Sequence, residues 1–196
     1  MAGSDPVPGG GSIAALNGAI ASALAAMVAN LTVGKKGYEA HEELMQHIAG
    51  VALQEKDTFI EAIDRDSEAY ASVYACFKLP KATDEEKAAR SAAIQEATKF
   101  AALVPMQVAR NAYELMTVIM DVARLGNRNA VTDACVAMMS ARSAVLGALM
   151  NVRINLGSLK DKEFVAKLQA EACELERLAC AKEKELLDEI NEELKV

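Results

Sequence analysis

Apolar side chains recur along this chain at steps of three and four residues, the spacing of one face of an α-helix. The pattern predicts helices over about 12–32, 38–77, 83–125, 129–156 and 160–194, and no strand. Short linkers make successive helices antiparallel. We therefore expect an all-α protein, with five long helices in an antiparallel up-and-down bundle that forms a single domain over residues 1–196.

Residues that start or stop a helix mark these boundaries. Glycines, which commonly end helices, follow the first, third and fourth: Gly34, Gly126 and Gly157. Pro80, in the segment KLPK, stops the second helix because proline cannot continue the backbone hydrogen bonds. Thr83 and Glu86 match a capping box at the start of the third helix. Pro105 predicts a bend within that helix.

The first predicted helix has no charged side chain between Asp5 and Lys35, and about 20 apolar residues suffice to cross a bilayer. Its composition nevertheless argues against a membrane span. Alanine inserts weakly, asparagine is costly in hydrocarbon, and no aromatic residue marks an interface. A signal peptide would carry a basic region before the apolar run, and none precedes it. We expect a buried central helix, whose small side chains let its neighbours approach closely.

Composition narrows the class of partner. The net charge of −7 argues against nucleic acid or anionic lipid as the main partner. The four cysteines form no CxxC pair, which favours reduced thiols in a cytoplasmic protein. With two histidines and no Cys/His cluster, we expect no dedicated zinc site, and we assign no metal ligand; Mg²⁺ bound by carboxylates is the alternative.

One stripe of the second predicted helix is apolar except for two acids. Its members are Leu44, Ile48, Val51, Glu55, Phe59, Ile63, Asp66, Tyr70, Val73 and Phe77. Asp66 therefore lies on the core face, with Asp64 close by. A buried carboxylate is costly unless it is paired or retained for chemistry. The structural alternative is a salt bridge to an inward-pointing arginine, such as Arg110 or Arg142.

The fourth predicted helix carries a stripe of small and polar residues, which lines a cleft or packs against another helix. The stripe comprises Asp133, Ala137, Ser140, Ala144, Ala148, Asn151 and Asn155. A helix rises about 1.5 Å per residue, which gives the height of each residue along the bundle axis. By this measure its two asparagines lie at about the same height as Asp64, Asp66, Pro105 and the start of the first helix. Asp133, Lys35 and Lys36 fall at the opposite end. One small ligand contacts both groups only if an antiparallel partner subunit brings its other end alongside.

Three consecutive glycines, Gly9, Gly10 and Gly11, precede the first predicted helix. The start of a helix presents unpaired backbone N–H groups and a partial positive charge, and glycine allows a ligand to approach them closely. Ser12 follows as a capping residue, which is its structural alternative. Three glycines exceed what a cap requires.

Four segments together resemble one family: DPVPGGGSIAALNGAIASALAAMVANLTVGKKGY, IDRDSEAYASVYACFKLPKATDEEKAAR, GNRNAVTDACVA and NVRINLGSLKDKEF. They are similar to the cyclodeaminase domain of formiminotransferase-cyclodeaminase and to stand-alone methenyltetrahydrofolate cyclohydrolases. The resemblance implies an all-helical homodimer whose substrate is a folate, with no separate cofactor. It implies cyclisation of 5-formiminotetrahydrofolate to 5,10-methenyltetrahydrofolate with loss of ammonia. The alternatives are hydrolysis of methenyltetrahydrofolate to 10-formyltetrahydrofolate, or a helical folate-binding protein without turnover.

Within this resemblance, each candidate residue has an expected role. Asp66 and Asp64 divide proton transfer and binding of the pterin edge, and Asp133 is the rival catalytic carboxylate, or a partner of the helix dipole. The expected substrate-binding residues are Gly9, Gly10, Gly11, Ser12, Asn151, Asn155, Lys35 and Lys36. The two lysines suit the glutamate tail of folate by charge.

Overall fold

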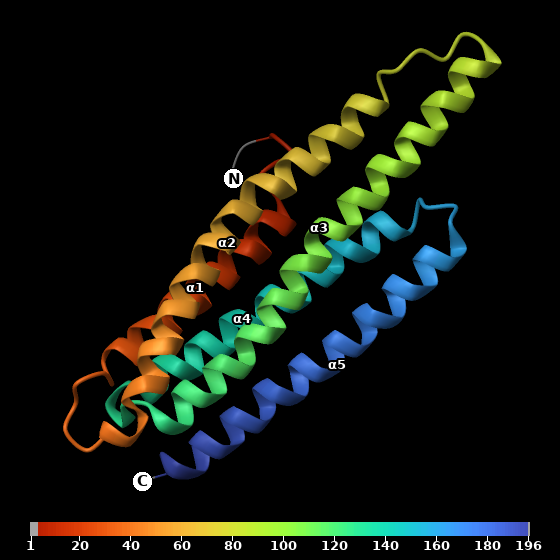
Figure 1. Cartoon of the computed structure of the whole chain (residues 1–196). Helices are drawn as coiled ribbons and strands as arrows, with labels where there is room; N and C mark the ends of the chain where they lie inside the picture. The colour runs from red at the N-terminus through yellow and green to blue at the C-terminus, as the bar shows by residue number, and fades with distance from the viewer. Residues whose placement is uncertain (1–3, 196) are drawn as a thin grey trace.

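The computed structural model describes residues 4–195, and this range folds into helices without a β-strand. The long helices are α1 (Gly10–Asn30), α2 (Glu42–Cys76), α3 (Asp84–Leu125), α4 (Val131–Leu156) and α5 (Lys162–Glu193). Two 3-10 turns, η1 (Glu39–His41) and η2 (Arg128–Ala130), precede α2 and α4. Successive long helices run in opposite directions (Figure 1), so the expected up-and-down bundle of five helices is confirmed.

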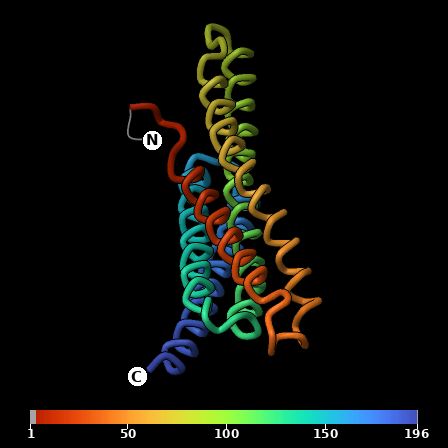
Figure 2. The backbone as a smooth tube through the Cα atoms, turned by 90° about the vertical axis from the view of Figure 1, so that its left-hand side faces the viewer, coloured from red at the N-terminus to blue at the C-terminus, as the bar shows by residue number. Residues whose placement is uncertain are grey.

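The helix α4 lies at the centre of the bundle. It packs against α1 on one side and α3 on the other, while α5 lies along α4 and α3 (Figures 1 and 2). The helix α1 is in turn held between α4 and α2. Elements distant in the sequence, the start of α1 and the end of α4, are thereby brought to the same end of the bundle.

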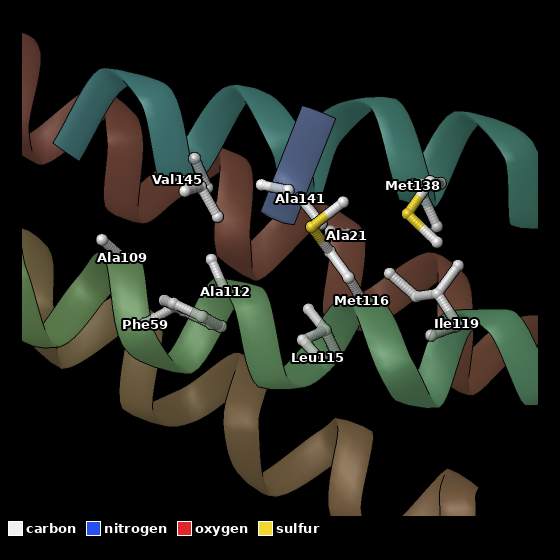
Figure 3. Packing of buried hydrophobic residues seen from close by; sticks show 14 of the residues in the cluster. Ala21, Phe59, Ala109, Ala112, Leu115, Met116, Ile119, Met138, Ala141 and Val145 are labelled. Carbon is white, nitrogen blue, oxygen red and sulfur yellow. The ribbon is translucent and has the colours of Figure 1, made fainter. Parts of the chain in front are cut away.

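The core is built mainly from small side chains, so that the helices approach closely. In Figure 3, Ala109 and Ala112 of α3 point toward Val145 of α4, and all three are fully buried. A Cβ atom added to Gly18 of α1 would lie 2.6 Å from the ring of Phe59 on α2, so this position accepts only glycine without a rearrangement. Close approach of this kind explains the alanine content that the sequence shows.

Two helical segments are long and apolar enough to span a bilayer by composition, Gly10–Asn30 and Arg128–Leu156. In the structure, 61% of the apolar window of the first and 50% of that of the second are buried against other helices. The expectation that α1 is a central helix of the bundle is confirmed, with Ala15, Ala21 and Ala25 fully buried.

The end of α2 and the start of α3 form an antiparallel arm that extends past α1 and α4 (Figure 1). Ala69 of α2 packs against Ala101 and Val104 of α3 between its two helices. The expectation that Tyr70 and Phe77 belong to the core is wrong, because their side chains are 44% and 53% exposed. The helical spacing is correct, but beyond the start of α1 no further helix among residues 4–195 covers this face of α2.

The capping box predicted before α3 is present, since Thr83 and Glu86 exchange their hydrogen bonds. The helix continues through Pro105 as one element. The boundaries of α2 and α4 differ from expectation, because the first residues of each form a 3-10 turn instead.

Candidate functional site

A cavity of about 290 Å³ opens where α1 begins, α4 ends and the arm leaves the bundle. Its walls come from the segment before α1, from α2 and α3, and from the last turns of α4. The lining residues are Pro6, Val7, Gly9, Gly10, Gly11, Asp66, Ala69, Tyr70, Val73, Ala101, Asn151, Ile154 and Asn155. The rise per residue predicted that the glycines, Asp66 and the two asparagines lie at the same height along the bundle axis. The structure confirms this, because all of them line the cavity.

The carboxylate of Asp66 lies against the first turn of α1. The Ser12 hydroxyl donates a hydrogen bond of 2.9 Å to Asp66 Oδ2. A Cβ atom on Gly11 would lie 2.1 Å from Asp66 Oδ1. The carboxylate therefore occupies the space that a side chain at position 11 would need. The positive end of the α1 dipole favours a negative group at this place. The helix begins at Gly10 with Gly9 as its N-cap, so the expectation that Ser12 caps α1 is wrong.

Asp66 has no arginine partner within residues 4–195. Both arginines proposed as its structural alternative pair with α5 instead. Arg110 forms a double hydrogen bond with Glu171, at 2.6 and 2.8 Å, which raises the pKa of the guanidinium and lowers that of the carboxyl. Arg142 Nε lies 3.3 Å from Glu183 Oε2. The carboxylate on the cavity wall is thus held by a hydroxyl and a helix start rather than by a cation.

The two asparagines of α4 lie one turn apart and also line the cavity. Asn151 donates to the carbonyl oxygen of Gly147 at 2.8 Å, and its amide lies beside Gly10, where an added Cβ would be 3.3 Å from Nδ2. Asn155 donates to the carbonyl oxygens of Ala101 and Asn151, both at 2.9 Å. Each amide oxygen keeps its capacity to accept a hydrogen bond from a ligand.

Several apolar lining residues of the cavity were not predicted as site residues, among them Tyr70, Val73 and Ile154. Tyr70 and Val73 line it from the arm, and Ile154, 76% exposed, lines it from α4. The Tyr70 ring stacks on that of Tyr74, with centroids 6.4 Å apart and an angle of 8° between the planes. The step of four residues between the two tyrosines was the available signal, but the same spacing also describes a core stripe.

The structure does not bring Asp64 into the cavity. Its side chain is exposed, because residues two apart on a helix point in nearly opposite directions. Within one chain, Asp66 lines the cavity and Asp64 does not. Asp133 lies half-buried in the first turn of α4, at the opposite end of the bundle.

Lys35 and Lys36 also lie at that opposite end. They share a shallow depression with Gly34, Glu39 and Glu42. The backbone N–H of Gly34 donates to Glu42 Oε2 at 2.8 Å, and that of Gly37 donates to Glu39, which lowers the pKa of Glu39. Two carboxylates thus accompany the two lysines, and neither lysine contacts the cavity within one chain.

The cavity combines groups suited to a polar, planar ligand. A carboxylate, two amides and a helix start provide hydrogen bonds, while Tyr70 and Val73 provide an apolar face. The carboxylate of Asp66 is able to take up or deliver a proton at a reacting nitrogen or oxygen. In the part of the chain that the structure describes, no three His, Cys, Asp or Glu side chains gather closely enough to hold a metal ion.

Comparison with known proteins gives concordant results. Residues 1–174 match the family model described as formiminotransferase-cyclodeaminase. The chain is 42% identical over 164 residues to methenyltetrahydrofolate cyclohydrolase of Methylorubrum extorquens, covering 84% of this chain and 79% of that protein. It is 33% identical over 160 residues to formimidoyltransferase-cyclodeaminase of Rattus norvegicus, covering 82% of this chain and 30% of that longer protein.

The fold is likewise similar to a solved structure. The crystal structure of formiminotetrahydrofolate cyclodeaminase from Thermotoga maritima superposes with a TM-score of 0.84 and 32% sequence identity. The match covers 96% of this chain and 92% of that one.

Proposed function

This chain belongs to the formiminotransferase-cyclodeaminase family, and we propose that it is the folate enzyme that converts 5-formiminotetrahydrofolate to 5,10-methenyltetrahydrofolate and ammonia. The observation that carries the proposal is the Asp66 carboxylate, which lines a cavity of about 290 Å³ together with the amides of Asn151 and Asn155. The named activities of the relatives support the substrate class.

The reaction requires two proton movements at neighbouring nitrogens. N10 attacks the carbon of the protonated formimino group and loses its proton, so that a tetrahedral carbon bonded to N5, N10 and an amino group (NH2) forms. The amino nitrogen then gains a proton, its bond to carbon breaks, and ammonia leaves the methenyl cation. Asp66 accepts the first proton and returns it to the amino group. The Ser12 hydroxyl and the start of α1 hold the carboxylate in place for both steps.

Hydrolysis of 5,10-methenyltetrahydrofolate is a second candidate, favoured by the 42% identity to a cyclohydrolase of similar length. Water attacks the methenyl carbon and loses a proton, N5 is protonated, and the bond from carbon to N5 breaks as the hydroxyl group loses its own proton. This leaves 10-formyltetrahydrofolate, with net release of one proton. The same tetrahedral centre and the same carboxylate serve both reactions. The proposed site is therefore common to the two activities. They differ in the attacking group, which is N10 or water, and in the leaving group, which is ammonia or N5.

Methenyltetrahydrofolate absorbance, followed from each side with purified protein, tests the proposal. Its appearance from 5-formiminotetrahydrofolate, together with ammonia release, is the expected result. Disappearance of added methenyltetrahydrofolate, faster than the spontaneous rate and without turnover of the formimino compound, would establish the cyclohydrolase instead. A folded protein that binds folate but accelerates neither reaction would overturn the enzymatic proposal in favour of a binding protein.

We also propose that the chain acts as a homodimer in the cytoplasm, without a membrane or nucleic-acid partner. Large apolar side chains remain exposed along α1 and α4, which pack side by side: Ile20, Met27, Leu31, Val136, Met139, Met150 and Ile154. A second copy, packed antiparallel on this face, would cover them and bring its Lys35 and Lys36 end toward the cavity. Sedimentation at micromolar concentration, without detergent, is expected to give the mass of a dimer.

A further inference from the structure

Proline within α3 leaves one backbone carbonyl of that helix without its usual donor. In an α-helix the carbonyl oxygen of residue i accepts from the N–H of residue i+4. Pro105 has no N–H, so the helix itself supplies no donor for the Ala101 carbonyl oxygen. Ala101 is only 7% exposed and lines the cavity. A buried carbonyl in this position requires a partner from another element.

The partner is the Asn155 side chain, reaching across from α4. Its Nδ2 donates to the Ala101 carbonyl oxygen at 2.9 Å. The same nitrogen donates to the Asn151 carbonyl oxygen at 2.9 Å. The two N–H bonds of the Asn155 amide therefore each have a backbone acceptor, one on α3 and one on α4. These two contacts fix the amide plane. The remaining polar atom of the side chain, Oδ1, is an acceptor on the wall of the cavity.

We infer that Pro105 is a positioning residue, which fixes Asn155 so that this side chain presents a hydrogen-bond acceptor, and never a donor, to the bound substrate. The complementary ligand group is an N–H donor, such as the ring N–H or amino group of a reduced pterin. In this respect the inference rests on the proposed function. Any other residue at 105 would supply an N–H that competes with the Asn155 amide for the Ala101 carbonyl oxygen, and this competition would weaken one of the two contacts that fix the amide.

The substitution Pro105→Ala tests this role, because it restores the helical hydrogen bond without adding atoms that reach the cavity. We expect the dissociation constant of 5-formyltetrahydrofolate, measured by calorimetry, to rise about tenfold, as loss of one well-placed hydrogen bond predicts. Val108→Ala is the matched control: it removes two carbons from a buried position on the same helix and leaves the backbone hydrogen bonds unchanged. Its dissociation constant is expected to equal that of the wild type.

A double-mutant cycle separates positioning from a general structural effect. In an Asn155→Ala background, Pro105→Ala is expected to produce no further weakening. An equal tenfold loss in both backgrounds would overturn the inference, since Pro105 would then act without Asn155. An unchanged dissociation constant in the single variant Pro105→Ala would overturn it as well.

A second measurement does not depend on the proposed function. The Asn155 side-chain amide protons, assigned by their loss in Asn155→Ala, are expected to exchange with solvent about tenfold faster in Pro105→Ala than in the wild type. Equal exchange rates would overturn the positioning role even if folate binds. A wild type whose amide is protected, but which binds no 5-formyltetrahydrofolate, would instead overturn the proposed function and the pterin donor together, leaving the fixed amide as a structural contact.

Discussion

Both ends of this bundle gather polar side chains where helices start and stop, but they use them differently. At the end with the 30–42 and 126–130 turns, the backbone N–H of Asn127 donates to Thr32 Oγ1 at 2.8 Å, and the Asn127 amide donates to the Leu31 carbonyl. Thr32 donates in turn to the Val28 carbonyl, at 2.8 Å. These hydrogen bonds close the turns and leave little capacity for a ligand.

At the other end, polar atoms that are able to accept further hydrogen bonds line the cavity. Asp66 receives one side-chain donor, from Ser12, and each amide oxygen of Asn151 and Asn155 is available beside a cavity. Polar residues on an apolar stripe therefore indicate a ligand site only where their hydrogen bonds are incomplete and a cavity adjoins them. The same residue types, fully bonded to each other, indicate a structural closure.

Replacing Asp66 by Asn at the cavity end should have the largest effect on turnover. The amide keeps the shape of the carboxylate and is able to accept from Ser12, but it cannot exchange a proton with the substrate. Turnover should fall about 10²- to 10⁴-fold, the usual range for a general acid or base, while the thermal midpoint stays close to that of the wild type. Initial rates by methenyltetrahydrofolate absorbance, paired with thermal unfolding, measure both quantities.

Asp64→Asn is the matched control for that substitution, because it makes the same change two residues away on an exposed face. Its rate should equal that of the wild type. A full rate in Asp66→Asn would reduce Asp66 to a structural partner of α1. If Asp133→Asn lost the activity instead, the chemistry would belong to the opposite end.

Gly11→Ala should produce the next largest effect, by displacing the same carboxylate without changing it. The added Cβ would lie 2.1 Å from Asp66 Oδ1, so either the side chain or the start of α1 must move. A shift of about 1 Å costs up to about 100-fold in rate, and overpacking costs about 1–3 kcal/mol of stability.

Gly50→Ala provides the comparison for Gly11→Ala. Gly50 lies in the interior of α2, and beyond its chain neighbours and the adjacent backbone of α2 nothing lies within 4 Å of its added Cβ. It should raise the free energy of unfolding by about 0.5–1 kcal/mol and leave the rate unchanged. If Gly11→Ala behaved like Gly50→Ala, the Asp66 carboxylate would not require its present position.

The sequence was sufficient to predict the helices and the height of the candidate site along the bundle axis. Periodicity, the capping box at Thr83 and Glu86, and the terminal glycines depend on local interactions, which a single sequence records. A constant rise per residue then placed Asp66, Asn151 and Asn155 at one end, because long antiparallel helices leave little freedom along their axis.

The direction of individual side chains around that axis was harder to predict. Periodicity assigned Tyr70 to the core because it cannot show where the covering helix ends. Asp64 was grouped with Asp66 by proximity in sequence, although their helical directions differ. The hydrogen bond from Asn155 to Ala101 joins residues 54 positions apart, and it depends on tertiary packing that no local pattern contains.

Asn127→Ala should affect stability and leave the chemistry intact. It removes the amide that donates to the Leu31 carbonyl at 3.2 Å and accepts from the backbone N–H of Asn129 at 3.1 Å. Asn127 is only 7% exposed, so an unpaired carbonyl beside it costs about 1–3 kcal/mol. Urea unfolding should show this loss, with kcat and KM within twofold of the wild type. A lower kcat at undiminished stability would assign the turn end a part in the reaction.

The paired substitution of Lys35 and Lys36 by Ala should have the smallest effect, and it tests whether the two ends cooperate across a dimer. If the lysines of one subunit bind the glutamate carboxylates of a substrate held by the other, KM should rise about two- to fivefold, as expected for exposed ion pairs. The rise should be small because Glu39 and Glu42 share the depression, and it should diminish with added salt. Lys184→Ala, which removes an exposed charge from α5, should leave KM unchanged. Equal KM values for the paired variant and the wild type at low salt would confine the substrate to the cavity end of one chain.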